Sequence, residues 1–438
     1  MKQKIAAVLL FAAVLLSAAD YKLNITTDKP AGYYNQNEPI VYQFEVTGKD
    51  GKPADAEVTT TIHSEGQADR TETVKVTGGK AQLKIMPVQP GWTLVRGVIQ
   101  TEMPPAAPGR QPSVVRKSNV MSAGAISRQE EIRRGADMPE DFDAFWDAEI
   151  AKLKKVPMNP RLREIQHKNS DKIGAWEVTL DCVGPRPASG YLAMPRNAKP
   201  KSLPLFIQYD GAGIHQATPP IWYADVAICL TFNKYGIPND RALLKDYLKS
   251  DIDGYETNGC DDRDKVFFKW MILRNLRGQE FAKSLPEWNG KVMIINGESL
   301  GGGQALICGA LDPDVTFINA MVPALCDHNA ERKKRTNGWP NVLNQLRKAG
   351  ADEAKIKKSS LAVGYVDAAN FMHRLNPKTE VSIGTGLLDT LCPPSSVIAA
   401  YNEIPKANVK YLWTNPKAGH GAGNEHAAKR IFEIIGKI

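Results

Sequence analysis

One stretch of the chain, Lys291–Leu311, restricts the possible folds more than any other. Residues 292–295 form a short apolar run typical of a buried strand, and Gly297-Glu298-Ser299-Leu300-Gly301 follows as a G-x-S-x-G pattern. Residues 304–311 then have the small, apolar composition of a buried helix. This order of strand, glycine-rich turn and helix is what a nucleophile elbow requires, in which a serine hydroxyl projects above the edge of a sheet. The sequence therefore predicts that Ser299 is a nucleophile.

Two other interpretations of this turn remain open from the sequence. It could be a tight strand-to-helix connection whose serine takes no part in chemistry. It could also be a phosphate-binding turn, because backbone N–H groups at a helix N-terminus bind anions. The phosphate-binding interpretation is the weaker one, because no G-K-[ST] sequence follows Gly301.

The start of the chain has the pattern of an export signal. Lys2 and Lys4 precede the apolar run Ile5–Leu16, and Ser17-Ala18-Ala19 is a small-residue cleavage site. The run is short for a membrane span, and no later stretch approaches about 18 apolar residues. No cysteine lies near the cleavage site to carry a lipid anchor. We expect residues 1–19 to be a signal peptide and the protein to be exported, periplasmic or secreted, without a membrane anchor.

Charge and cysteine content argue against several classes of partner. The formal net charge is +8, but the basic residues are scattered, and the densest cluster, Glu331–Arg335, is typical of a solvated loop. We therefore expect no nucleic-acid binding. The six cysteines show no C-x-x-C spacing, which disfavours a zinc site, and six in a chain of 438 residues do not make a disulfide scaffold.

The composition divides the chain into two structural parts. Residues 20–103 contain alternating, β-rich runs separated by glycine turns, and these predict an immunoglobulin-like β-sandwich. Residues 104–134 begin with a proline-rich stretch and are predicted to be a linker or seam. We expect the sandwich to act as a spacer or as a contact in a homo-oligomer. Glycan binding is the less favoured role, although Tyr33, Tyr34 and Trp92 could form an aromatic platform.

The second part, residues 135–438, is predicted to be an α/β-hydrolase domain. From about residue 174 onwards we expect eight strands, of which the first two form a hairpin and the later six are apolar runs with helical segments among them. Such runs indicate a mostly parallel sheet that is buried on both faces. A long interruption at residues 324–379, between the sixth and seventh strands, is predicted to form a lid-like insertion.

The partners of Ser299 are expected at the ends of later strands. A serine hydroxyl needs a base, and the base needs an orienting carboxylate; in this fold the chain order is Ser, Asp or Glu, His. Asp389 follows the seventh strand, and His420 follows the eighth in a Gly-His-Gly setting. These three residues form the predicted catalytic triad. His426 remains a less favoured base, and Asp327, after the sixth strand, remains a less favoured acid.

The oxyanion hole requires two backbone N–H donors near the reacting carbonyl. Leu300, directly after the nucleophile, is expected to supply one of them. The loop after the third strand should supply the other, and we choose Tyr209, with Asp210 as the alternative. The residues further predicted to contact substrate are Asp210, Gly211, His328 and Pro393.

With these residues placed, the catalytic part resembles carbohydrate esterase family 7, the acetyl xylan esterase and cephalosporin C deacetylase family. The resemblance covers roughly residues 125–438 and excludes the sandwich. The stretches that carry it are PEDFDAFW (139–146), IQYDGAG (207–213), GESLGGGQAL (297–306), VPALCDH (322–328) and GLLDTLCPPSSVIAAY (386–401). The resemblance implies removal of acetyl groups from sugar hydroxyls without a metal or cofactor. It also implies that Ser299, Asp389, His420 and the Tyr209 backbone have the roles given above.

Two features depart from that family. Leu300 stands where the family usually has glutamine. The family's Arg-Gly-Gln motif usually lies well before the nucleophile, whereas Arg277-Gly278-Gln279 lies shortly before Ser299, and we interpret it as coincidental.

The leading hypothesis is an exported serine esterase that deacetylates xylan-type oligosaccharides or other acetylated sugars. The alternatives are a serine hydrolase for a bulkier, feruloyl-type ester or a peptide, and a non-catalytic glycan-binding protein.

Overall fold

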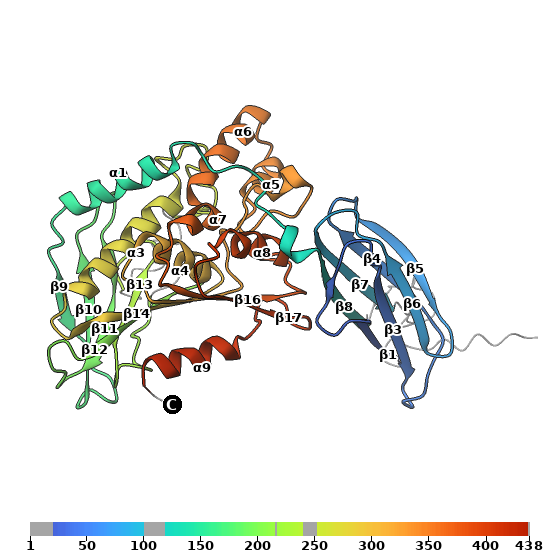
Figure 1. The fold of residues 1–438 in the computed structure, drawn as a ribbon, viewed down its shortest axis with the longest axis horizontal. Helices are drawn as coiled ribbons and strands as arrows, with labels where there is room; N and C mark the ends of the chain where they lie inside the picture. The colour runs from blue at the N-terminus through green and yellow to red at the C-terminus, as the bar shows by residue number, and fades with distance from the viewer. Residues whose placement is uncertain (1–20, 100–118, 215–216, 240–251, 437–438) are drawn as a thin grey trace, which may run out of the picture.

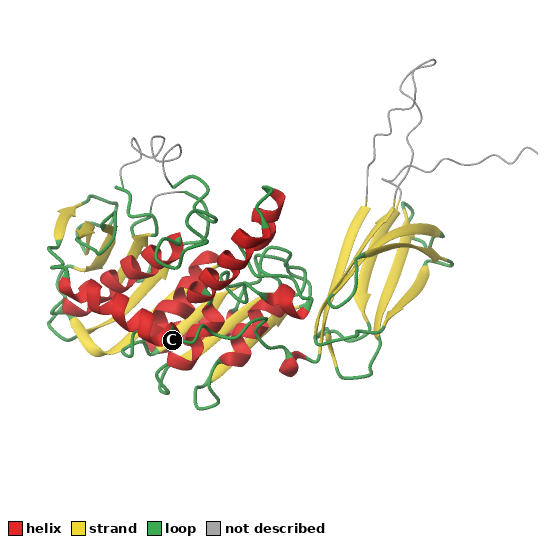
Figure 2. Ribbon diagram, turned by 90° about the horizontal axis from the view of Figure 1, so that it is seen from above, coloured by secondary structure: helices red, strands yellow, loops and turns green. Residues whose placement is uncertain are grey.

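The computed structural model describes residues 21–99, 119–214, 217–239 and 252–436. The predicted signal peptide, residues 1–19, therefore lies outside the described part of the chain. The amino-terminal strands form one body, and the remainder forms a larger body of helices and strands beside it (Figure 1). Seen from above, the first body contains strands and loops, whereas helices cover the sheet of the second (Figure 2).

The amino-terminal body consists of two sheets with a shared apolar core. The first sheet has the order β1-β3-β6 and comprises β1 (Tyr21–Thr27), β3 (Ile40–Gly48) and β6 (Lys80–Ile85). The second has the order β2-β8-β7-β4-β5 and comprises β2 (Tyr33–Tyr34), β8 (Asn119–Ser127), β7 (Gly91–Ile99), β4 (Ala56–Ser64) and β5 (Arg70–Val76). Alternate residues of β3 point inward, because successive side chains of a strand face opposite sides of a sheet. The inward residues include Tyr42 and Phe44.

The predicted boundary of this body is wrong. Residues 104–134 are not simply a linker, because β8 pairs antiparallel with β7 along the full length of both strands. The sequence of β8, NVMSAGAIS, contains few β-branched residues and does not alternate, so it lacks the usual signature of a strand. Residues 104–118 of the predicted linker lie outside the described residues. The suggested glycan platform is also not formed, because Tyr34 and Trp92 are both buried.

The larger body is built on a single sheet that has nine described strands rather than the eight predicted. Its order is β17-β16-β15-β14-β12-β13-β11-β10-β9. The strands are β9 (Arg161–Glu164), β10 (Ile173–Leu180), β11 (Ala188–Pro195), β12 (Leu203–Tyr209), β13 (Ile228–Asn233), β14 (Trp288–Glu298), β15 (Phe317–Met321), β16 (Glu380–Gly386) and β17 (Lys410–Asn415). The six strands β12, β13, β14, β15, β16 and β17 are parallel to one another. The strands β9, β10 and β11 pair antiparallel. The extra strand is β9, a short exposed strand with the sequence RLRE.

Helices cover both faces of this sheet. The helices α1 (Phe142–Lys155), α3 (Phe267–Ser284), α4 (Leu300–Leu311) and α8 (Pro394–Glu403) lie on one side, and α9 (Glu425–Ile434) lies on the other (Figure 1). Leu205 and Ile207 of β12 belong to the apolar cluster on the first side, whereas Phe206 between them packs with residues of α9. Because both faces are covered, the central strands are apolar on both sides. Among the described helices, none is both long enough and apolar enough to cross a membrane.

The predicted lid-like insertion is only partly peripheral. It contains η3 (Ala330–Lys333), α5 (Val342–Lys348), α6 (Glu353–Ala362), η4 (Val363–Val366), α7 (Ala368–Phe371) and η5 (Met372–Arg374). Phe371 is fully buried and packs against Phe142 and Trp146 of α1. The stretch from η4 to η5 is thus part of the core, so the lid description does not apply to it. The buried face of α1 contains Phe142, Phe145 and Trp146, at positions i, i+3 and i+4. This is the apolar face that the helix pattern predicts.

Candidate active site

Ser299 lies at a sharp turn between β14 and α4. Its backbone angles are φ 58° and ψ −121°, a region that residues other than glycine rarely adopt. Such a conformation costs free energy and persists only where the surroundings enforce it, which is typical of functional sites. The turn also needs glycines on both sides. A Cβ on Gly297 would lie 2.2 Å from the Gly301 carbonyl oxygen, and a Cβ on Gly301 would lie 2.2 Å from that of Tyr209.

We predict that Gly301→Ala destabilises the protein by about 1–3 kcal/mol, since the new methyl group overlaps the backbone of β12. Urea unfolding of the two proteins measures the change. Gly423→Ala is the matched control, because the space around Gly423 is open and the expected effect is within about 0.5 kcal/mol. Equal stability of Gly301→Ala and the wild type would contradict this packing of the turn.

The structure brings the three predicted triad residues together in a hydrogen-bonded series. His420 Nε2 lies 2.8 Å from Ser299 Oγ, and His420 Nδ1 lies 2.8 Å from Asp389 Oδ2. Asp389 is fully buried, whereas the His420 side chain is 29% exposed. Because the carboxylate can only accept, Nδ1 carries the proton and Nε2 is free to accept the proton of the serine hydroxyl. This arrangement is the one that activates a serine for attack.

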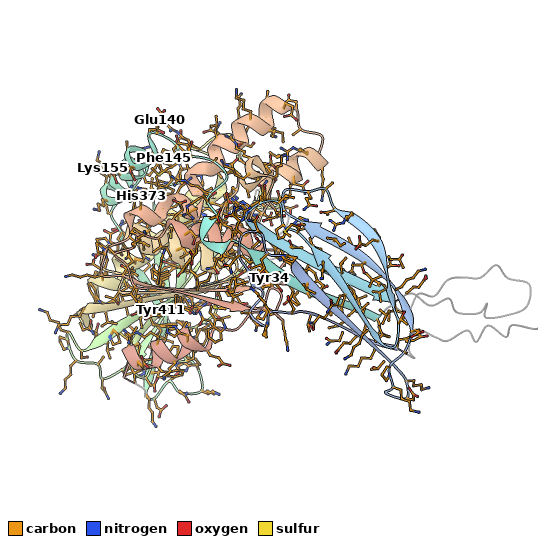
Figure 3. All side chains as sticks on the ribbon, turned by 45° about the vertical axis from the view of Figure 1, so that its right-hand side comes forward. Tyr34, Glu140, Phe145, Lys155, His373 and Tyr411 are labelled. Atoms are coloured by element: carbon orange, nitrogen blue, oxygen red, sulfur yellow. The ribbon has the colours of Figure 1, made fainter. Side chains whose placement is uncertain are left out.

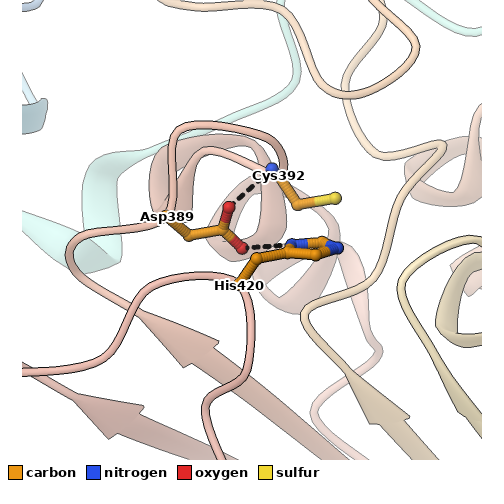
Figure 4. Close-up of side chains that lie close together, drawn as sticks. All are labelled: Asp389, Cys392 and His420. Atoms are coloured by element: carbon orange, nitrogen blue, oxygen red, sulfur yellow. Dashed lines mark hydrogen bonds and ion pairs between the residues drawn. The ribbon is translucent and has the colours of Figure 1, made fainter.

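Asp389 is fixed by the loop that carries it. The other carboxylate oxygen, Oδ1, accepts the backbone N–H groups of Leu391 and Cys392, at 2.9 and 3.0 Å (Figure 4). The loop lies against the loop that carries His420, and the Leu388 N–H donates to the Ala418 carbonyl at 3.0 Å. The carboxylate therefore has little freedom to turn away from the imidazole.

The pKa of His420 is raised above its ordinary value. The main cause is the hydrogen bond to Asp389; burial opposes it, and the charges of Asp389 and Glu298 add to the rise. An imidazole that is stabilised as a cation suits a base that must hold the serine proton during the reaction.

We predict that kcat/KM for an acetyl ester falls as the pH is lowered through the His420 pKa. The protonated imidazole cannot accept the Ser299 proton, so activity is full above this pKa and is lost below it. Because the pKa is raised, the midpoint of the loss should lie above about 6.5, the usual value for histidine. Initial rates over a range of pH, at substrate concentrations below KM, measure the midpoint. A midpoint below the usual value would contradict the prediction.

The backbone segment predicted to complete an oxyanion hole lies next to Ser299. The strands β12 and β14 are parallel neighbours, and Tyr209 pairs in register with Gly297. The first turn of α4, which begins at Leu300, packs against the Tyr209 carbonyl. An ideal Cβ on Gly211 would lie 3.8 Å from the Ser299 Cβ. The Tyr209 hydroxyl is buried and accepts from Gln279 Nε2 at 3.1 Å, so only the backbone of Tyr209 faces the elbow.

Two buried glutamines, neither of which was predicted to be a site residue, hold this region. Gln304 of α4 donates to the Asp210 carbonyl at 3.0 Å and accepts from Asn275 at 2.9 Å. Gln279 belongs to the Arg277-Gly278-Gln279 tripeptide, which the sequence analysis interpreted as coincidental. Arg277 is also buried, and it donates to the carbonyls of Leu153 and Val156 at the end of α1. The tripeptide thus connects α1, α3 and the strand that leads to Tyr209.

The residues that the sequence left open as acid or base make other contacts. Asp327 is buried in an ion pair with Arg335 at 2.7 Å, and its other carboxylate oxygen accepts the Gly135 N–H at 2.6 Å. His426, on α9, packs its ring against Tyr411. His373 pairs with Asp143 of α1, and Figure 3 shows it on the α1 side of the sheet, away from Tyr411. Within the described residues, none of these three side chains is hydrogen-bonded to Ser299.

Two of the predicted substrate contacts are not at the surface. His328 is 2% exposed, and burial lowers its pKa to about 4, so its ring is neutral at pH 7. Pro393 is also buried, directly before α8. The prediction that these two residues contact substrate is therefore not supported. Asp210 and Gly211 are partly exposed at the end of β12, where contact with a substrate remains a prediction.

The described residues contain one group with metal-ligand side chains, namely Asp389, Cys392 and His420. Figure 4 shows these side chains close together. Burial, with the charge of Asp389 adding to it, raises the pKa of the Cys392 thiol well above its usual value, which disfavours the thiolate that binds metals. Asp389 and His420 are also already paired with each other. The donor set thus fits a triad better than a metal site. All six cysteines are free thiols.

The fold and the hydrogen-bonded series of Ser299, His420 and Asp389 define a class: the larger body is an α/β-hydrolase with the side-chain arrangement of serine hydrolases. Within this class, the chain belongs to the acetyl xylan esterase (AXE1) family, whose sequence profile matches residues 125–437. The predicted resemblance to carbohydrate esterase family 7 is confirmed.

One characterised relative and two solved structures place the chain among its neighbours. It is 30% identical over 296 residues to the acetyl esterase Axe7A of Xylanibacter ruminicola, and the match covers 64% of this chain and 65% of the relative. The structure is similar to the acetyl xylan esterase from Paenibacillus sp. R4, with a TM-score of 0.61, 24% identity and coverage of 70% of this chain and 98% of the other. It is also similar to acetyl xylan esterase 1 from Thermoanaerobacterium sp. JW/SL YS485, with a TM-score of 0.60, 22% identity and coverage of 70% and 96%. These structural likenesses establish the α/β-hydrolase fold.

Proposed function

We propose that the protein is a serine esterase that removes acetyl groups from the hydroxyls of xylan-type oligosaccharides. The observation that carries the proposal is the series Ser299–His420–Asp389, which is complete and hydrogen-bonded at the carboxyl ends of the sheet strands. Membership of the acetyl xylan esterase family and the likeness to an acetyl esterase support the choice of the acyl group.

The geometry supports a two-step mechanism through an acyl-enzyme. The Ser299 oxygen attacks the acetyl carbonyl carbon while His420 Nε2 takes the hydroxyl proton. The tetrahedral intermediate collapses, the bond to the sugar oxygen breaks, and His420 returns the proton to that oxygen. Water then attacks the acetyl-enzyme with His420 again accepting a proton, which releases acetate and restores Ser299. The Leu300 and Tyr209 N–H groups are proposed to stabilise the negative charge on the carbonyl oxygen in both steps.

We further propose that the protein acts outside the cytoplasm, in the periplasm or after secretion. The proposal rests on the signal-like pattern of residues 1–19. Expression of the full chain followed by sequencing of the mature amino terminus tests export. Recovery of the uncleaved chain in the cytoplasm would contradict export.

We also propose an immunoglobulin-like topology for the amino-terminal sandwich, supported by its two packed, largely antiparallel sheets.

Acetate release from a panel of esters tests the activity. The panel contains 4-nitrophenyl acetate, an acetylated xylo-oligosaccharide, a feruloylated oligosaccharide and a peptide. The proposed function predicts release of acetate from the acetylated oligosaccharide and labelling of Ser299 by a fluorophosphonate probe. Preference for the feruloyl ester or for the peptide would assign a different substrate. Glycan binding without hydrolysis or labelling would indicate a non-catalytic protein.

A further inference from the structure

The amino-terminal sandwich and the hydrolase body share a small apolar core. Its buried members are Trp92 and Ile126 from the sandwich, Ile132, which follows it, and Leu387, Ile398 and Ala399 from the hydrolase body. Leu387 directly follows β16, and Ile398 and Ala399 belong to α8. The loop that carries Asp389 lies between these two elements. The sandwich therefore packs against β16 and α8, the two elements that flank the loop carrying Asp389.

One end of the acid loop is held by a tryptophan of the sandwich. The Trp92 indole N–H donates to the Leu387 carbonyl oxygen at 2.9 Å, and the bond is buried. The strand β8 approaches the same residue closely, since a Cβ on Gly124 would lie 2.1 Å from the Leu387 carbonyl oxygen. Only glycine allows the backbone of the sandwich to come this near. The start of the loop is thus enclosed by sandwich residues.

The other end of the acid loop is held by a buried carboxylate of the sandwich. Glu65 is 3% exposed, and its Oε1 accepts the hydroxyl of Ser395, in the first turn of α8, at 2.7 Å. The same oxygen accepts the Thr336 N–H at 2.9 Å, and Oε2 accepts the Trp92 N–H at 2.8 Å. One carboxylate thus connects α8 with the strand that carries Trp92.

We propose that the sandwich is a positioning element of the active site, in which Trp92 and Glu65 fix the two ends of the loop that carries Asp389. The inference rests on the proposed function of the Ser299 site. A role of the sandwich as a spacer or as a contact between copies stays a prediction beside it.

The position of the loop matters because Asp389 acts through His420. The carboxylate orients the imidazole and stabilises its cation, and it is itself held by N–H groups of its own loop. A shift of the loop therefore moves Asp389 relative to His420 Nδ1, now 2.8 Å away. Displacements of about 1 Å in supporting residues can lower rates by as much as about 100-fold.

Three substitutions test the proposal in the full chain. Trp92→Phe keeps an aromatic ring in the shared core but removes the donor to Leu387. Glu65→Gln keeps the shape of the side chain, but its amide group cannot accept from all three donors at once. We expect each variant to lower kcat on 4-nitrophenyl acetate on the order of tenfold with KM changed less than about twofold. Ser395→Ala removes one of these bonds from the hydrolase side and should lower kcat in the same way.

The pKa of His420 supplies a readout that a purely structural role would not move. The charged groups that act on this imidazole are Asp389 and Glu298, and the bond to Asp389 is the main cause of its raised pKa. Loosening the acid loop should therefore lower the pKa. NMR titration of the His420 ring, assigned by comparison with His420→Gln, is expected to show a lower pKa in Trp92→Phe and in Glu65→Gln than in the wild type.

Two matched controls separate positioning from general destabilisation. Tyr42→Phe removes a buried hydrogen bond to the Thr93 carbonyl inside the sandwich, and Gln89→Ala removes an exposed contact with the Lys333 carbonyl, which does not belong to the acid loop. Both controls should keep the wild-type kcat and His420 pKa. Wild-type kcat and His420 pKa in Trp92→Phe and Glu65→Gln would overturn the inference, and so would equal losses in the controls. Failure of the wild type to hydrolyse any ester would refute the proposed function instead, and the NMR titration would still test the positioning.

Discussion

Ser299→Ala is expected to lower kcat for an acetyl ester roughly a million-fold, because it removes the hydroxyl that is hydrogen-bonded to His420 Nε2 and would form the acyl-enzyme. The remaining rate should exceed that of the uncatalysed reaction, since the backbone donors of the proposed oxyanion hole are unchanged. Acetate release with the purified variant measures the loss. Labelling by a fluorophosphonate should disappear at the same time.

The control for this substitution is Ser202→Ala. The Ser202 hydroxyl is exposed and donates to the Lys199 carbonyl at 2.6 Å. We expect wild-type activity and labelling for this variant. Circular dichroism and thermal unfolding of the Ser299→Ala variant show whether its fold is preserved. Activity that survives in a folded Ser299→Ala protein would exclude Ser299 as the nucleophile.

Asp389→Asn is expected to lower kcat about 10,000-fold. The asparagine amide favours the wrong tautomer of His420 and does not stabilise the imidazolium. Asp327→Asn is the informative comparison, because the sequence left Asp327 open as the acid. We expect Asp327→Asn to keep kcat within several-fold of the wild type. Steady-state rates at a pH above the His420 pKa compare the two variants.

The main effect of Asp327→Asn should appear in stability. The substitution removes the carboxylate that pairs with the buried Arg335, and breaking a buried ion pair typically costs about 3–5 kcal/mol. Urea unfolding measures this loss, and the expected order is a larger loss of stability for Asp327→Asn and a larger loss of kcat for Asp389→Asn. The reverse order would show that Asp327 orients the base.

The site could be predicted from the sequence because its parts follow a fixed order. Ser299, Asp389 and His420 each follow an apolar run, and the carboxyl ends of parallel strands meet at one edge of a sheet. The fold of the larger body could be predicted for the same reason. The central strands β13 and β15, for example, are buried on both faces and therefore appear as largely apolar runs.

The errors concern elements whose local sequence does not reveal their surroundings. The strand β8 has a run of small residues around Gly124, which packs against Leu387, and β9 is short, charged and exposed. Glu65 has the local sequence of a polar turn, yet Ser395 and Thr336 make it an interior residue. These partners are distant in the chain, so no local sequence pattern predicts them.

The buried polar residues behind the elbow were missed for a related reason. Arg277 and Gln279 belong to the tripeptide that was interpreted as coincidental, but they satisfy carbonyl and hydroxyl groups inside the molecule. Hydrogen bonds of this kind depend on the three-dimensional arrangement of several elements. A glutamine or arginine near an elbow motif is thus a better candidate for an interior role than its polarity suggests.

The nine-stranded sheet also has edges that oppose aggregation. The exposed edge strand β9 has four residues, and Arg161, Arg163 and Glu164 form ion pairs with Asp181, Glu177 and Arg196. At the other edge, Thr414 of β17 is hydrogen-bonded to Tyr33 of the sandwich. A short charged edge discourages a second chain from adding a strand, and the sandwich contacts the other edge at Thr414. Edge-to-edge association through β9 is thereby disfavoured, even when the protein is concentrated.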